Sequence, residues 1–135
     1  LVIGYSGTGS PTGRMVAKVA KLISEVPERM EEMEAIANIT RAGLAALSAG
    51  NLEGLGMAMD ACHESLRKLE VSSSKLDRMV NAARPHSMGA KLTGAGGGGC
   101  MVALTHDPTR VSEAIEVAGG RPLMSRLGAQ GVRLL

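Results

Sequence analysis

Aromatic residues are almost absent from this chain of 135 residues, which has one Tyr, no Phe and no Trp. Proteins that bind single-stranded nucleic acid stack the bases on aromatic side chains, so the composition largely excludes that class of function. Neither sign of charge is in clear excess, because the chain has 15 Lys and Arg and 13 Asp and Glu. The formal net charge of +2 is small and the charged residues are spread evenly along the chain, so we expect no nucleic-acid partner.

Cysteines and long apolar runs are equally scarce. The two cysteines, Cys62 and Cys100, are too few for a disulfide framework or a metal cluster, which favours a reducing compartment such as the cytoplasm. No apolar run approaches the roughly 20 residues of a membrane-spanning helix, and we expect no membrane partner. The chain begins at Leu1 inside an apolar run without an initiator Met, so we expect it to be a piece of a longer protein.

What the chain does contain is enough apolar material for a single domain over residues 1–135, since 44% of its residues are hydrophobic. Its core must be built from aliphatic side chains and from the nine Met, which fill irregular gaps. Apolar runs at 1–3 and 100–104 predict strands, and residues 91–93, which lead into the glycine run, are read as a strand too. Residues 121–127 and 132–135 could each supply a closing strand.

Helical spacing of apolar residues predicts four consecutive helices after the first strand and a fifth after residue 107. The segregation of helices from strands predicts an α+β fold, with a mostly antiparallel sheet packed against four to five helices. Leu52, Leu55, Met59, Cys62, Leu66 and Leu69 form the cleanest stripe, on a helix that Asn51 would cap. Ser74 and Asp77 resemble a capping box for the fourth helix.

Gly94, Gly96 and Gly99 match the spacing G-x-G-x-x-G of dinucleotide-binding turns. Such a turn must open a helix that holds the pyrophosphate, whereas residues 100–104 predict a strand, so we reject this interpretation. Four consecutive glycines still need a reason, because each costs about 0.5–1 kcal/mol of backbone entropy relative to Ala. A bare backbone would let anionic groups or another backbone come close, and its N–H groups could form an anion-binding concavity. The alternative is a flexible connector between strands.

The other candidate residues carry weaker signals. Thr12 could contact a polar ligand or merely cap the helix that follows it. Cys62 lies on an apolar stripe and is a core residue rather than a nucleophile, and no ligand spacing links His63, His86 and His106. No Asp or Glu stands beside the glycine run to hold Mg²⁺, so we expect no catalytic residue and no metal ligand in this chain.

The segment Lys91–Cys100, with the sequence K-L-T-G-A-G-G-G-G-C, resembles the third conserved motif of the galacto-, homoserine-, mevalonate- and phosphomevalonate-kinase superfamily. Within that superfamily it most resembles the mevalonate kinases. Residues 12–19 and 71–77 are similar to other segments of the same kinases, and the resemblance covers nearly the whole chain. Ser73 departs from the pattern, because some members have His at that position, so contacts of that His cannot be transferred.

The resemblance implies the ferredoxin-like C-terminal domain of a two-domain kinase that transfers the γ-phosphate of ATP to the 5-hydroxyl of mevalonate, with Mg²⁺, in isoprenoid synthesis. The implied partner is the protein's own N-terminal domain, which in this family holds the ATP-phosphate loop, the catalytic Asp and the Mg²⁺ carboxylate. This chain alone would be inactive, and a homodimer is left open. The loop expected to line the ATP and substrate cleft comprises Gly94, Ala95, Gly96, Gly97, Gly98 and Gly99.

Within this loop, the resemblance implies that Ala95 and Gly96 lie near the mevalonate side and that Thr12 faces the cleft. Two alternatives remain open. The chain could belong to a related kinase that acts on phosphomevalonate or homoserine, because the glycine run marks the fold more than the phosphate acceptor. It could also be a stand-alone binding domain that kept the fold and lost the chemistry.

Overall fold

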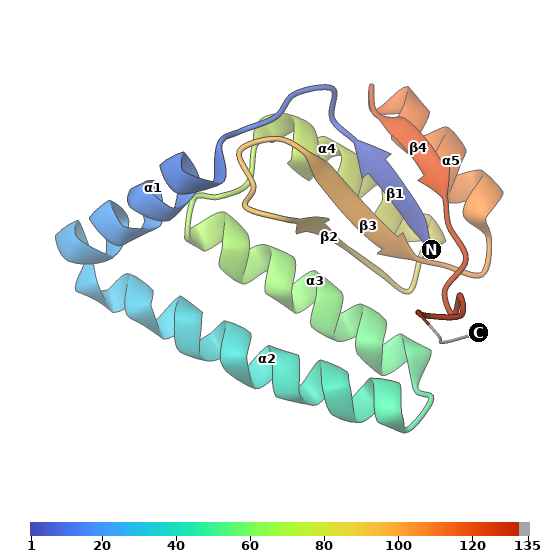
Figure 1. Cartoon of the computed structure of the whole chain (residues 1–135), viewed down its shortest axis with the longest axis horizontal. Helices are drawn as coiled ribbons and strands as arrows, with labels where there is room; N and C mark the ends of the chain where they lie inside the picture. The colour runs from blue at the N-terminus through green and yellow to red at the C-terminus, as the bar shows by residue number, and fades with distance from the viewer. Residues whose placement is uncertain (133–135) are drawn as a thin grey trace.

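The computed structural model describes residues 1–132, which form one antiparallel sheet with the strand order β2-β3-β1-β4 and five α-helices (Figure 1). The elements follow in the order β1 (Val2–Tyr5), α1 (Thr12–Glu25), α2 (Met30–Ser48), α3 (Leu52–Lys68), α4 (Ser74–Ala83), β2 (Gly89–Thr93), β3 (Cys100–Leu104), α5 (Pro108–Val117) and β4 (Arg121–Met124). Short 3₁₀ turns precede α2 and β2, at Pro27–Arg29 and Arg84–His86. The predicted α+β fold is therefore confirmed.

Strand β1 lies at the centre of the sheet and pairs with β3 on one side and β4 on the other. Val2 and Gly4 are buried, whereas Tyr5 is exposed, as the alternation of side chains along a strand requires. Helices α4 and α5 cover the buried face of the sheet (Figure 1). Residues 121–124 of the predicted 121–127 form β4, Val132 is in no strand, and residues 133–135 lie outside the described residues.

The core consists of aliphatic and Met side chains, as the composition predicts. Leu76, Met79, Val80 and Ala83 of α4 are all fully buried, and they form one cluster with Val2 and Met101 of the sheet and with Val111 and Ile115 of α5. The two methionines crowd the strand itself: a Cβ at Gly4 would lie 2.9 Å from Met101 Sδ and 2.9 Å from Met79 Cε. Flexible Met side chains thus occupy the volume that aromatic rings fill in other cores.

Helix α3 seals the edge of the sheet, because it packs along the outer side of β2. The backbones approach so closely that a Cβ at Gly56 would lie 2.1 Å from Met88 O. Two edge amides of β2 donate to α3: Ala90 N–H to Asp60 Oδ1 at 2.8 Å, and Leu92 N–H to His63 Nδ1 at 3.2 Å. An edge strand with its outward amides satisfied in this way is closed to pairing with another chain.

The stripe predicted on α3 faces α2, and the helix also buries a second face, with Gly56 and His63, against the sheet edge. One local prediction is wrong. The N-cap of α4 is Ser73 rather than Ser74, since Ser73 Oγ accepts from Leu76 N–H at 3.3 Å. The predicted cap Asn51 is confirmed, since it accepts from Gly54 N–H, and Asp107 caps α5 by accepting from Arg110 N–H. Within residues 1–132, every helix is too short or too polar to cross a membrane.

The Gly56 contact predicts a large difference between two glycine-to-alanine changes in helices. Gly56→Ala should lower the free energy of unfolding by about 3 kcal/mol, because α3 must move off β2 to admit the methyl group. Gly13→Ala is the control: Gly13 lies in α1, where an added methyl group would meet no atom within 4 Å, so we expect a gain of about 0.5 kcal/mol. Urea unfolding of both variants measures the difference, and equal stabilities would contradict the close approach.

Candidate functional site

The glycine loop, residues 94–99 between β2 and β3, is packed onto two other loops of the chain. One is the segment 6–11 between β1 and α1, and the other is the segment 69–73 between α3 and α4; Figure 1 shows all three at the same end of the sheet. Backbone hydrogen bonds join them: Gly97 N–H donates to Val71 O at 2.7 Å, Gly99 N–H to Thr8 O at 2.6 Å, and Ser6 N–H to Gly99 O at 2.8 Å. The loop is therefore held in place and is not a flexible connector.

The neighbouring loops explain why glycine is needed at three successive positions. A Cβ at Gly96 would lie 2.0 Å from Val71 O, one at Gly97 2.7 Å from Met15 Sδ, and one at Gly98 2.9 Å from Thr8 O. All three distances are below any real contact of a Cβ atom. Of the two close approaches that the sequence suggested, an anion or another backbone, the structure shows the second.

The donors of the loop divide into two groups. The amides of Gly97 and Gly99 are used inside the chain, so they cannot also serve an anion. The amides of Gly94, Ala95, Gly96 and Gly98 find no acceptor among residues 1–132, but Gly96 and Gly98 are buried. Gly94 is exposed and Ala95 is half-buried. Gly94 and Ala95 therefore form the part of the loop that remains available to a ligand or to another domain.

Thr12 begins α1 beside this loop, but it does not cap the helix. The N-cap is Pro11, which makes no side-chain capping bond, and Thr12 is exposed. Ser10 and Met15, before and after Thr12, both lie against Gly97. The capping role considered for Thr12 is therefore wrong, whereas its position facing a cleft remains a prediction.

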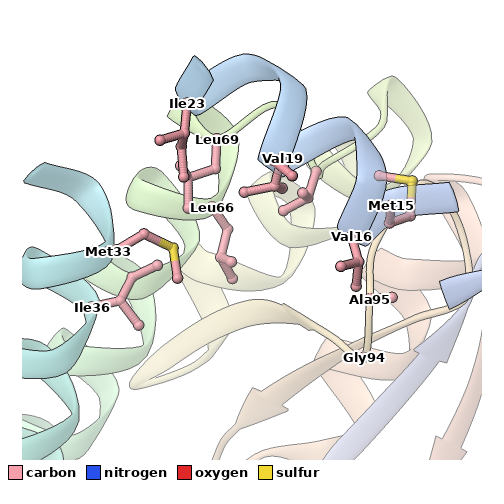
Figure 2. A pocket seen from close by; sticks show the side chains of 12 residues that line it. Met15, Val16, Val19, Ile23, Met33, Ile36, Leu66, Leu69, Gly94 and Ala95 are labelled. Carbon is pink, nitrogen blue, oxygen red and sulfur yellow. The ribbon is translucent and has the colours of Figure 1, made fainter. Parts of the chain in front are cut away.

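An apolar pocket of about 500 Å³ lies next to the glycine loop (Figure 2). Helix α1 forms one wall and helices α2 and α3 form the other, with the glycine loop at one end. The lining side chains are almost entirely aliphatic or Met: Met15, Val16, Val19, Ala20, Ile23, Met33, Ile36, Leu66, Leu69, Val71, Gly94 and Ala95. Such a surface suits apolar groups and offers nothing to a phosphate.

The pocket exists because α1 stands partly apart from the rest of the fold. The apolar residues of α1 share one face of the helix, but only Met15 is buried, and Val16 is 63% exposed. A polar contact ties its middle to the α3–α4 loop, where Lys18 Nζ donates to Glu70 O at 2.6 Å. The apolar periodicity of α1 therefore predicted the helix correctly but not what its stripe faces.

A buried polar cluster lies behind the glycine loop, centred on His63 of α3, which is 1% exposed. Since Nδ1 accepts from Leu92 N–H, it carries no proton, and the ring proton is on Nε2. Nε2 lies 3.2 Å from Asp77 Oδ1, an ion-pair distance without the geometry of a straight hydrogen bond. Asp77 also accepts from Ser72 Oγ at 2.5 Å and from Arg67 Nε at 3.2 Å.

Burial lowers the pKa of His63 below its ordinary value of 6.5, and the positive charge of Arg84 lowers it further. Asp77 and Glu64 act in the opposite direction but do not cancel these effects. The sequence analysis looked for metal-ligand spacing among the three histidines. This cluster holds no such spacing, so it was not predicted. The signal was the spacing of Gly56, Asp60 and His63, which places one glycine and two polar residues on the same helix face.

The remaining candidates do not form a site. Cys62 is partly buried and lines a shallow groove between α2 and α3, which is consistent with a packing role. His86 and His106 line a separate surface pocket with Asp107 and Arg110. Among residues 1–132, no three His, Cys, Asp or Glu side chains come together in a group that could hold a metal ion.

Alanine substitutions at Gly94 and Gly96 would distinguish the cost of backbone strain from the cost of close packing. Gly94 and Gly96 both have positive φ angles, +80° and +83°, but a Cβ at Gly94 meets nothing within 4 Å. Gly94→Ala should therefore lower the free energy of unfolding by about 1 kcal/mol through left-handed strain alone. Gly96→Ala should lower it by about 3 kcal/mol, because the loop must also leave Val71. Urea unfolding tests this, and equal losses would show that the Val71 contact does not matter.

The lowered pKa of His63 predicts that the chain loses stability in mild acid. Below pH 6.5 the unfolded chain binds a proton that the folded chain does not, so the free energy of unfolding falls from pH 6.5 towards the folded pKa. Each unit of pKa difference is worth about 1.4 kcal/mol. His63→Asn, whose amide oxygen can still accept from Leu92 N–H, should flatten the profile between about pH 7.5 and 5.5. The exposed His86 provides the control His86→Asn, which should retain the wild-type slope.

Comparison with known proteins agrees with this architecture. Residues 43–120 match the family model described as GHMP kinases C terminal. The mevalonate kinases of Pyrococcus furiosus and Pyrococcus horikoshii are 37% and 42% identical to this chain over 142 residues, which cover 99% of the chain and 42% of each relative. The chain thus spans less than half the length of these relatives.

Solved structures show the same likeness. The L. major mevalonate kinase in complex with R-mevalonate superposes with a TM-score of 0.76 at 30% identity, covering 87% of this chain and 36% of that one. The Methanococcus jannaschii mevalonate kinase superposes with a TM-score of 0.68 at 33% identity, covering 90% of this chain and 37% of that one. From the family match, these relatives and the shared fold, the chain belongs to the GHMP kinase family, as its C-terminal domain.

Proposed function

We propose that this chain is the C-terminal part of a mevalonate kinase, which transfers the γ-phosphate of ATP to the 5-hydroxyl of mevalonate. The observation that carries the proposal is the identity of 37–42% to mevalonate kinases along 99% of the chain. The glycine run supports it, because two neighbouring loops fix the bare backbone of residues 94–99 at one end of the sheet. Fixed geometry of this kind is what a positioning loop in a phosphoryl-transfer site requires.

The role assigned to this domain is positional. The loop of Gly94, Ala95, Gly96, Gly97, Gly98 and Gly99 would line the cleft, and the accessible amides of Gly94 and Ala95 are the donors that it could turn towards ATP or mevalonate. Thr12, exposed beside this loop, would face the same cleft. Fixed amides stabilise developing negative charge without reorganising during the reaction.

ATP and Mg²⁺ would be held mainly outside this chain, by an N-terminal domain that is its partner within the full-length protein. Phosphoryl transfer needs carboxylates for the metal, and residues 1–132 bring no suitable cluster together. We therefore expect the 135-residue chain alone to show no turnover. The proposed setting is a cytoplasmic enzyme of isoprenoid synthesis.

The test is a phosphorylation assay of a full-length protein containing this chain, with ATP, Mg²⁺ and one acceptor at a time. We expect turnover with mevalonate, and a fall of at least about 100-fold in kcat/KM for Gly96→Val, since displacement of such a loop by about 1 Å can cost this much. Gly94→Ala is the matched control, because it changes the same loop without a collision and should stay within about tenfold of wild type.

Other outcomes would redirect the proposal. Turnover with phosphomevalonate or homoserine, but not with mevalonate, would keep the kinase fold and change the acceptor. Turnover by the 135-residue chain alone would contradict the dependence on a second domain. A full-length protein that binds ligands but transfers no phosphate would support a binding domain that lost the chemistry.

A further inference from the structure

His63 connects the two segments that hold the glycine loop. On one side, its Nδ1 accepts from Leu92 N–H, and Leu92 lies in β2 two residues before Gly94. On the other side, its Nε2 faces Asp77, whose Oδ1 also accepts the hydroxyl of Ser72. The ring therefore lies between the strand that leads into the loop and the segment on which the loop rests.

The connection through Asp77 and Ser72 ends on the glycine loop itself. Ser72 follows Val71, whose carbonyl accepts Gly97 N–H at 2.7 Å and fills the space where a Cβ of Gly96 would stand. Ser72 is thus fixed by its hydroxyl, and Val71 by its carbonyl. We expect a displacement of Asp77 to move Ser72, and with it the carbonyl that holds Gly97.

The connection from His63 Nδ1 to Leu92 N–H depends on the protonation state of the ring. A proton on Nδ1 would place an N–H donor against the Leu92 N–H, so the bond to β2 could not persist. The charged groups around the ring come from each element packed against it. They are Asp60, Glu64 and Arg67 of α3, Asp77 of α4, Arg84 of the 3₁₀ turn, and Lys91 of β2, whose Nζ donates to Leu92 O.

Burial and the charge of Arg84 oppose protonation of the ring, whereas Asp77 and Glu64 favour it. Asp77 can pair with an imidazolium through Nε2, while the donor now on Nδ1 repels the amide of Leu92. Arg84 is already paired with Asp60 and Glu64, so it adds no new partner. Protonation would therefore shift the ring away from β2 and towards α4.

We propose that His63 is a positioning residue for the glycine loop: its neutral ring holds β2 against the segment 71–72, and protonation of the ring releases Gly97 from Val71. The claim about the loop stands on the contacts in this chain. Its consequence for catalysis rests on the proposed function, in which the loop lines the cleft.

The test is amide hydrogen exchange and nitrogen-15 NMR of the chain between pH 7.5 and 5.5, which needs no substrate. As the His63 ring titrates, the amide resonances of Leu92 and Gly97 should shift together. The protection factor of Gly97, corrected for the intrinsic pH dependence of exchange, should fall by about tenfold, the equivalent of one pKa unit of coupling.

Variants separate positioning from general stability. His63→Asn cannot titrate, so the protection of Gly97 should become independent of pH. Ser72→Ala breaks the connection through Asp77 and Ser72 and should lower the protection of Gly97 about threefold to tenfold at pH 7.5. Ser74→Ala is the matched control, because Ser74 is an exposed serine two residues further along, at the start of α4, and the change should leave Gly97 unaffected.

Three results would overturn the inference. Leu92 could respond to the titration while Gly97 does not, which would make His63 a structural residue of the sheet edge only. The response of Gly97 could persist in His63→Asn, which would assign it to another group. The ring could also stay neutral until the chain unfolds. A full-length protein inactive on mevalonate would remove the proposed function but leave these NMR results intact.

Discussion

Backbone packed directly against backbone, with no side chain between, is the constraint on which this structure depends. It occurs where Gly56 of α3 meets Gly89 of β2, and again where Gly96 of the glycine loop meets Val71. At both places a single methyl group would force the segments apart. The first contact fixes the helix against the sheet edge, and the second fixes the loop against the end of the same helix, so the position of the loop follows from that of α3.

Helix α3 has two buried faces with different chemistry, and the division explains the site. Its aliphatic face packs on α2 and contributes Leu66 and Leu69 to the apolar pocket. Its second face is polar where it meets β2, because the amides of an edge strand need acceptors and no further strand supplies them. Asp60 and His63 are these acceptors. A buried histidine is thus a consequence of closing the sheet edge, and it brings a titratable group close to the loop.

The glycine loop presents two environments to whatever binds beside it. Towards the interior, its amides donate to the carbonyls of Thr8 and Val71 and the Gly99 carbonyl accepts from Ser6 N–H, and these bonds hold its shape. Towards the outside, it offers the unpaired amides of Gly94 and Ala95 and borders a pocket with an almost wholly apolar lining. Polar donors and an apolar wall side by side are typical of sites for small organic anions, in which the donors orient the ligand and the wall excludes water.

The sequence by itself determined the elements and their class. Apolar periodicity placed the five helices, and the strand predicted at residues 100–104 excluded a dinucleotide-binding turn, because a strand rather than a helix follows the glycines. The run of glycines also marked the loop. Only the tertiary structure decided what these elements face: that the stripe of α1 lines a pocket, that Thr12 does not cap its helix, and that His63 lies at a sheet edge. Periodicity describes one element at a time, whereas burial and hydrogen-bond partners depend on segments far apart in the chain.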